Sequence, residues 1–244
     1  MKILVCLTVV PDTTSKITTD SSEFGINYEG LTMIIGPYDD YALSRAVELK
    51  ESMGCQVDII HIGTSSSEVI LKKALALGVD NAYRIDIEPN SSNQVANELA
   101  HFINQNSYDL ILMGKESIDY NSSMVHYLLG NITGIKVYNP VMKLSINGEN
   151  IEITTEVTNG KMDLEIELPA ILGCQEPIAE WKIPTMRGIM MARTKTIQVL
   201  DPVGKSDKEL ISSKQIQKER LKKIIKEENA EEIIDILRNH NLIK

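Results

Sequence analysis

Apolar residues follow two alternating patterns along the first 140 residues of this 244-residue chain. Continuous apolar runs, which are typical of strands buried on both faces, occupy residues 2–10, 57–62, 82–87 and 109–113. Between and after these runs, apolar residues recur at helical spacing over residues 39–53, 66–77, 92–105 and 122–130. Strands that alternate with helices of this length predict βαβ units with right-handed crossovers around a parallel sheet.

The pattern changes after residue 141. Apolar and polar residues then alternate one by one over residues 142–147, 150–157 and 162–168, which predicts antiparallel strands. Asn147-Gly148 and Asn159-Gly160 separate these runs and are typical of type I′ hairpin turns. Three further segments follow: an extended run, an apolar irregular loop and a short amphipathic helix, at residues 168–171, 177–193 and 229–242.

Together these elements predict an α/β fold that is doubly wound around a mostly parallel sheet, with an added antiparallel β meander and a C-terminal helical arm. Composition shifts at Pro202-Val203-Gly204, so we place one domain at residues 1–200 and the arm at 201–244. Residues 204–244 carry 10 basic and 8 acidic side chains, whereas the preceding residues carry 15 and 26. The stretch from Ser206 to Lys226 is especially rich in charge.

Composition narrows the class of protein. Hydrophobic residues are 43% and charged residues 24%, which excludes disorder over the whole chain. The net charge of −9 argues against non-specific nucleic-acid binding, which needs clustered Lys and Arg. No apolar run reaches the roughly 18 residues of a membrane span, and we see no signal or transit peptide. We therefore expect a cytoplasmic protein without membrane insertion.

Motifs of catalytic chemistry are missing from the sequence. Three widely spaced cysteines and four unpaired histidines predict neither a disulfide framework nor a metal site. We find no GxGxxG, GxxxxGK[ST] or GxSxG motif. The sequence therefore predicts a chain without catalytic residues of its own.

Three local segments are candidates for binding. The first, Gly114 to Ser123, follows a strand and precedes a helix, where Asn121, Ser122 and Ser123 could hold a phosphate or could simply cap the helix. In the second, residues 36–40, we prefer the interpretation that Asp39 or Asp40 caps a helix. The third, residues 183–192, carries three methionines that suit either an adaptable contact surface or packing onto the chain's own core.

At these residues the sequence resembles the β subunits of electron-transfer flavoproteins. The resemblance extends from Lys2 to about Asp201. The segments that carry it occur in the family's order: Lys2-Ile3-Leu4-Val5 with Val10-Pro11-Asp12, Gly36-Pro37-Tyr38-Asp39-Asp40, Ala74-Leu75-Ala76-Leu77-Gly78-Val79-Asp80, Gly114-Lys115-Glu116-Ser117-Ile118-Asp119, Leu168-Pro169-Ala170 and Ile189-Met190-Met191-Ala192-Arg193.

The resemblance implies an adenine-nucleotide-hydrolase-like fold and a heterodimer in the bacterial cytoplasm. It implies a structural AMP in this chain, or a second FAD in some members, and an α subunit that holds most of the redox FAD. It also implies flavin dehydrogenases such as acyl-CoA dehydrogenases as partners, docked through Met186, Ile189 and Met190. The residues that it assigns to the nucleotide are Cys6, Gly36, Pro37, Tyr38, Asp39, Ile62, Gly63, Gly114, Lys115, Ser117, Asp119, Asn121, Ser122 and Ser123.

Two departures from the family's pattern concern the nucleotide. Gly36 replaces an Asn, and Met124-Val125-His126 replaces Gln-Thr-Gly, which removes one phosphate-binding hydroxyl. The function expected from the resemblance is to support electron transfer from flavin dehydrogenases to an acceptor oxidoreductase. The alternative is a stand-alone nucleotide-binding regulator of universal-stress-like fold, which has no use for the Ile189-to-Arg193 segment or the charged arm.

Overall fold

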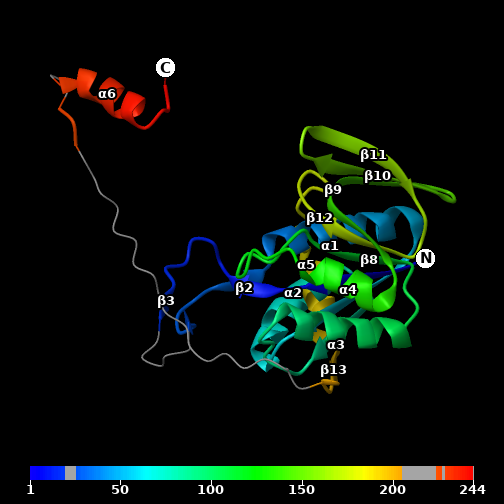
Figure 1. The fold of residues 1–244 in the computed structure, drawn as a ribbon. Coiled ribbons are helices and arrows are strands. Elements are labelled where there is room, and N and C mark those ends of the chain that lie inside the picture. Colours follow the sequence, from blue (N-terminus) through cyan, green and yellow to red (C-terminus); the bar gives the residue numbers. More distant parts are fainter. Residues whose placement is uncertain (20–25, 205–223, 227–228, 244) are drawn as a thin grey trace.

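A computed structural model describes residues 1–19, 26–204, 224–226 and 229–243 of the chain. One nine-stranded sheet organises the fold, in the order β11-β10-β9-β12-β8-β1-β6-β7-β13 (Figure 1). The strands are β1 (Lys2–Leu7), β6 (Gln56–Ile62), β7 (Asn81–Ile85), β8 (Leu110–Gly114), β9 (Lys136–Asn147), β10 (Asn150–Val157), β11 (Gly160–Ile166), β12 (Ala170–Cys174) and β13 (Ile197–Leu200). In the part of this order that begins at β9 and continues with β12, β8, β1, β6, β7 and β13, every neighbouring pair of strands is parallel, which confirms the predicted sheet.

Helices cover both faces of the parallel sheet, as the doubly wound prediction requires. Along β1, Ile3 and Val5 pack with α1 (Pro37–Met53) and α2 (Glu68–Ala76). Leu4 and Cys6 point to the opposite face, which is covered by α3 (Ser92–Gln105) and α4 (Val125–Thr133). The continuous apolar run of β1 is therefore explained, because both of its faces are core.

The antiparallel strands continue the same sheet. The 12 residues of β9 pair in parallel with β12 on one side and antiparallel with β10 on the other. Both hairpins lie where the sequence predicts them, but the type I′ prediction is wrong. In the β9–β10 turn only Gly148 has positive φ, +64°, and in the β10–β11 turn Thr158 and Asn159 have none.

Short elements depart further from the sequence prediction. The apolar run 2–10 is divided into β1 and β2 (Val9–Pro11), and β2 pairs with β5 (Met33–Ile35) in a separate ribbon. A second ribbon joins β3 (Thr18–Thr19) and β4 (Ile26–Asn27). A 3₁₀ turn, η1 (Ser65–Ser67), precedes α2.

The loop predicted at 177–193 contains a helix, α5 (Met186–Thr194). Thr185 caps it, because its hydroxyl accepts a hydrogen bond of 3.1 Å from the Gly188 N–H. In the sequence, Pro184 and Gly188 indicate a break in a helix. In the structure Gly188 lies inside α5 and must be glycine, because a Cβ there would collide with the carbonyl of Ala76 in α2. Tertiary packing therefore overrides the local signal.

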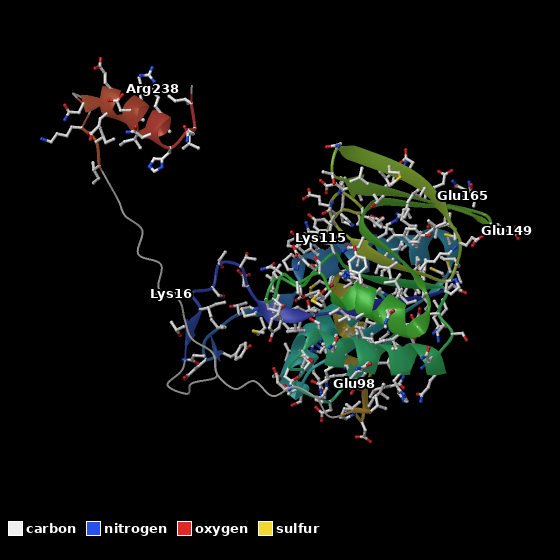
Figure 2. The ribbon with its side chains drawn as sticks, in the orientation of Figure 1. Lys16, Glu98, Lys115, Glu149, Glu165 and Arg238 are labelled. Carbon is white, nitrogen blue, oxygen red and sulfur yellow. The ribbon has the colours of Figure 1, made fainter. Side chains whose placement is uncertain are left out.

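The predicted C-terminal helix is present as α6 (Glu231–Asn239), and none of its residues is buried. The charged stretch from Ser206 to Lys226 lies almost wholly outside the described residues. Before it, the Val203 and Gly204 N–H groups donate hydrogen bonds of 2.9 and 3.1 Å to the carboxylate of Glu98 on α3, the residue labelled in Figure 2. The chain is thus anchored to the domain up to residue 204.

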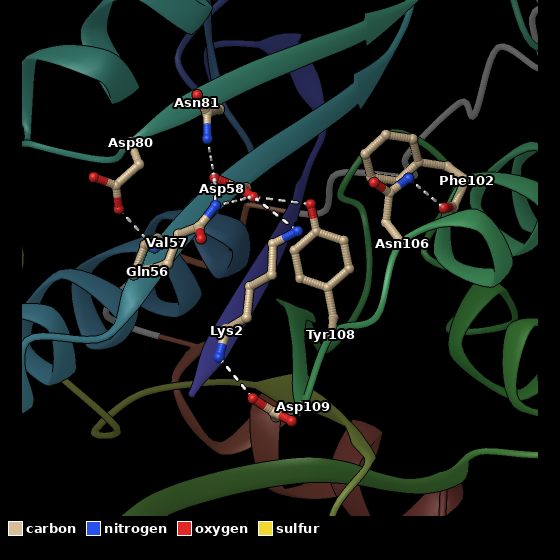
Figure 3. Close-up of polar contacts among 10 residues, drawn as sticks. All are labelled: Lys2, Gln56, Val57, Asp58, Asp80, Asn81, Phe102, Asn106, Tyr108 and Asp109. Carbon is tan, nitrogen blue, oxygen red and sulfur yellow. Dashed lines mark hydrogen bonds and ion pairs between the residues drawn. The ribbon is translucent and has the colours of Figure 1, made fainter.

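A polar network around Asp58 lies at the amino ends of β1, β6 and β7 (Figure 3). This fully buried carboxylate accepts hydrogen bonds of 2.8 Å from Asn81 and 3.0 Å from the Tyr108 hydroxyl. The Lys2 ammonium lies 3.7 Å from it and over the Tyr108 ring. Burial, with the nearby Asp58, raises the pKa of Tyr108. Each of these groups has a partner, so the network stabilises the edge and leaves none of the four open to a ligand.

Candidate functional site

A cavity of about 620 Å³ opens at the carboxyl edge of the sheet. The chain passes from β1 to β6 and β7 on one side, and then returns to place β8 on the other side of β1. Ligands of open α/β sheets bind outside the carboxyl ends of the strands at such a reversal. The cavity is lined from the ends of β1, β6 and β8 and from the starts of α3 and α4, and its size suits a mononucleotide.

Asp39 connects the two strands that border this reversal. Its carboxylate accepts hydrogen bonds from the Thr8 N–H at 2.8 Å, from the Thr8 hydroxyl, and from the Gly114 N–H at 2.7 Å. Thr8 follows β1 and Gly114 ends β8. Burial raises the pKa of Asp39 to about 6, although these hydrogen bonds oppose the rise. The N-cap of α1 is Gly36 and no described side chain caps the helix, so the interpretation that Asp39 or Asp40 caps it is wrong.

Two glycines make room for this carboxylate. A Cβ on Gly114 would stand 2.6 Å from Asp39 Oδ1 and 2.7 Å from the Asp39 nitrogen. A Cβ on Gly36 would collide with the Thr8 hydroxyl and lie 2.6 Å from Asp39 Oδ2. The missing side chain at Gly36 is therefore not a vacant hydrogen-bonding position, since Thr8 and Asp39 occupy that space.

The start of α4 is the part of the cavity best suited to an anion. The helix begins at Val125, three residues later than predicted, so Ser122 and Ser123 lie in the preceding loop. No side chain caps its first turn. The Ser117 hydroxyl is buried beside the cavity and has no hydrogen-bond partner among the described residues. Asn121 and Ser123 have positive φ, 48° and 49°, which is uncommon outside glycine and frequent at functional sites.

Two buried histidines line the cavity, and the resemblance assigns neither of them to the nucleotide. The side chain of His61 on β6 reaches the neighbouring strand β1, where its Nδ1–H donates a hydrogen bond of 2.9 Å to the Leu7 carbonyl. His126 lies in the first turn of α4, where its Nε2–H donates a hydrogen bond of 2.6 Å to the Gly114 carbonyl. Burial lowers the pKa of both rings, so both are neutral at pH 7.

The charges around the cavity are acidic. Asp39, Glu88, Glu116 and Asp119 line it, and no Lys or Arg does so among the described residues. Lys115, predicted to contact the nucleotide, instead lies over the Tyr38 ring at 4.7 Å (Figure 2 labels Lys115). A phosphate here would depend on backbone N–H groups and hydroxyls rather than on a cationic side chain.

The structure brings together nine of the fourteen residues that the resemblance assigns to the nucleotide. The cavity is lined by Cys6, Asp39, Ile62, Gly63, Gly114, Ser117, Asp119, Ser122 and Ser123. The other five stand outside the lining: Gly36, Pro37, Tyr38, Lys115 and Asn121. Prominent among the lining residues outside that set of fourteen are Thr8, Tyr28, His61, Glu88, Ser91, Tyr120 and His126.

The predicted docking residues form an exposed apolar surface on α5. Met186 and Met190 are 75% and 66% exposed, and Ile189 is also exposed. The preceding segment adds the exposed Trp181 and Ile183. Clustered apolar exposure of this kind is typical of a protein–protein contact.

Among the helices that the structure describes, none is long and apolar enough to cross a membrane.

Comparison with known proteins places this architecture in a family. A family model described as "Electron transfer flavoprotein domain" matches residues 24–203. The electron transfer flavoprotein subunit beta of Bacillus subtilis (strain 168) is 31% identical over 205 residues, which cover 82% of this chain and 79% of that protein. The acryloyl-CoA reductase electron transfer subunit gamma of Anaerotignum propionicum is 26% identical over 218 residues, covering 86% and 81%.

A more distant relative shows the same extent of match. The electron transfer flavoprotein subunit beta of Homo sapiens is 24% identical over 208 residues, covering 83% of this chain and 82% of that protein. The family-model match, over residues 24–203, includes α5 and every strand of the large sheet except β1, rather than a single motif. This chain belongs to the electron transfer flavoprotein family, as a relative of its beta subunits.

Proposed function

We propose that this chain is the β subunit of a heterodimeric electron-transfer flavoprotein and that it binds AMP as a structural ligand. In this role it supports electron transfer from flavin dehydrogenases to an acceptor oxidoreductase. The redox chemistry belongs to an FAD held mainly by the α subunit. The chain itself contributes a rigid sheet, a nucleotide that fills the cavity, and the α5 surface. Family membership disfavours the alternative of a stand-alone regulator.

One observation carries the AMP proposal: an uncapped helix start beside a buried, unpartnered hydroxyl. Within the part of the chain that the structure describes, the first N–H groups of α4 lack a side-chain acceptor and the Ser117 hydroxyl lacks a hydrogen-bond partner. Buried polar groups rarely stay unpaired in a native protein. A phosphate at this point accepts from the N–H groups and the hydroxyl, and it meets the positive end of the helix dipole.

The proposal is tested by the nucleotide content of the purified complex. Denaturation should release AMP in an amount that matches the chain. Ser122→Asp, which puts a carboxylate beside the start of α4, should lower AMP occupancy at least tenfold through charge repulsion. Ser52→Asp is the matched control and should leave the AMP content unchanged, because Ser52 is exposed near the end of α1 and does not line the cavity. Full AMP content in Ser122→Asp, or no nucleotide in the wild type, contradicts the proposal.

A further inference from the structure

The most exposed methionine side chains of the molecule are gathered on α5. Met186 and Met190 are 75% and 66% exposed, more than any of the remaining methionines. Met191, on the same helix, is 53% exposed. By contrast, Met113 is 7% exposed in the core that the sheet forms with α3 and α4. An oxidant in solution therefore reaches the thioethers of α5 far more readily than the thioether of the core.

Met186 and Met190 lie on the side of α5 that faces away from the domain. Successive residues are about 100° apart around an α-helix, so both lie about 160° from Gly188. Gly188 marks the inner side, because a Cβ there would collide with the Ala76 carbonyl of α2. Ala192, the single buried residue of α5, follows one turn later. A chemical change at the two outer sulfurs therefore does not alter the close contact between Gly188 and α2.

The chemistry of a thioether makes this surface sensitive to hydrogen peroxide. A sulfur lone pair attacks one peroxide oxygen, so that an S–O bond forms and the O–O bond breaks. The sulfur loses two electrons, the peroxide gains them, and its second oxygen leaves as water with both protons. The product is methionine sulfoxide, which is polar, and sulfoxide reductases convert it back to the thioether. A flexible apolar side chain thus becomes a polar one in a reversible way.

We propose that Met186 and Met190 form an oxidation site through which hydrogen peroxide reversibly weakens the docking of partner dehydrogenases. This inference rests on the proposed role of α5 in docking and adds a means of regulating that surface. An apolar interface that buries a sulfoxide oxygen without a donor loses affinity, because the lost hydration of the oxygen is not replaced. The two residues are one turn apart, so both oxygens meet the same surface of the partner.

The test treats the complex of this chain and its α subunit with hydrogen peroxide and then removes the oxidant with catalase. Mass spectrometry of tryptic fragments locates the sulfoxides, and Met186 is the only methionine of fragment 183–187. Met186 and Met190 should be oxidised about tenfold or more faster than Met113, the buried reference. Electron transfer per bound flavin, from an untreated dehydrogenase at low concentrations of the complex, should slow about tenfold. Methionine sulfoxide reductase should restore it.

Replacing both sulfurs isolates their contribution. The double variant Met186→Leu/Met190→Leu keeps apolar side chains of similar size and has no thioether at these positions. Its transfer rate after treatment is compared with its own rate before treatment, and the two should agree. Met162→Leu is the matched control, because it replaces an exposed methionine of β11. In this control, peroxide should slow transfer as it does in the wild type.

Three outcomes overturn the inference. If Met113 is oxidised as fast as Met186, exposure on α5 does not select the site. If peroxide slows the double leucine variant as much as the wild type, another residue carries the sensitivity. If both methionines are fully oxidised and transfer is unchanged, the sulfoxides do not weaken docking. Met186→Ala in the same assay then separates the two claims: slower transfer leaves the docking role of α5 intact, and unchanged transfer refutes that role as well.

Discussion

The Asp39 carboxylate shows how one side chain can shape a cavity formed by several strands. It accepts from Thr8 on one side and from Gly114 on the other, and both acceptor oxygens are used within the protein. Asp39 is therefore a positioning residue for the pocket, which holds the ends of β1 and β8 together. Because Asp39 is buried, its charged carboxylate loses the stabilisation that water provides, and this desolvation destabilises the folded state.

This cost predicts a dependence of stability on pH. The pKa of Asp39 rises from 3.8 to about 6 on folding, so the folded chain binds the proton more tightly than the unfolded chain. The free energy of unfolding should therefore fall as the pH rises from about 4 to about 6, by at most about 3 kcal/mol, and then level off. In Asp39→Asn this contribution should be absent.

The measurement is the free energy of urea unfolding at several pH values between 4 and 7, as the difference between wild type and Asp39→Asn. The difference isolates Asp39 from groups common to both proteins. Asp40 is the main group of this kind, because burial also raises its pKa to about 6. Burial lowers the pKa of His61 and His126, so these rings change the pH dependence of stability in the opposite direction. Cys6 and Cys174, beside Asp39, ionise only at much higher pH. A difference that does not change with pH refutes the raised pKa.

Residues that act locally could be predicted from the sequence, and residues that act through distant partners could not. Ser122 and Ser123 were found because a strand, a loop and a helix follow one another along the chain. Asp39 was found by resemblance but interpreted as a cap, because its true partners lie 31 and 75 residues away. His61 and His126 fell within buried segments, and only the packed structure shows that each has a backbone carbonyl beside it.

At the scale of elements, α5 shows why a helix can be concealed in its sequence. Its capping residue Thr185 is recognisable, but Pro184, Gly188 and the absence of a continuous apolar stripe favour a loop. The helix forms because it packs on α2, where Gly188 allows close approach to Ala76. Its single buried residue is Ala192, so most of its apolar surface remains free for a partner.

Met186→Ala tests this surface. The side chain is 75% exposed at the start of α5, so its removal should change the free energy of unfolding by no more than about 0.5 kcal/mol. Loss of an interface anchor costs about 2 kcal/mol or more, roughly thirtyfold in affinity. Electron transfer from a partner dehydrogenase, measured at low concentrations of the complex, should slow by a similar factor with flavin and AMP contents unchanged.

Met162→Ala supplies the control for that experiment. Met162 is an exposed methionine of β11, on a different element, so the same truncation there should leave transfer unaffected. Equal slowing in both variants indicates a general effect of methionine loss. A fall in stability of several kcal/mol in Met186→Ala, with normal transfer per folded molecule, makes Met186 a core residue instead.

At the scale of the whole molecule, strand order and helix placement follow from the alternation of patterns, and the position of the cavity follows from strand order. The sheet was predictable for this reason, since buried strands and right-handed crossovers leave few arrangements. The edge strand β13 could not be predicted, because its four residues are too few to show a clear pattern of apolar positions. The joining of the meander to the sheet through β9 depends on contacts between distant residues.

The two edges of the sheet lead to the last prediction, which concerns flavin. At the amino edge the polar groups around Asp58 are paired with one another, whereas the carboxyl-edge cavity holds the Ser117 hydroxyl and the start of α4, both without a side-chain partner among the described residues, so this cavity is the site we propose for a nucleotide. Four carboxyl side chains line that cavity, and no Lys or Arg among the described residues balances them, so it is poorly suited to the two charges of a pyrophosphate. We therefore expect the isolated chain to be colourless after purification, with the absorbance of flavin present only in the complex with its α subunit. The measurement is the visible spectrum of each preparation, with the denatured supernatant analysed for FAD and AMP. Stoichiometric FAD in the isolated chain would show that the cavity accepts a dinucleotide, and it would contradict the division of ligands between the two subunits.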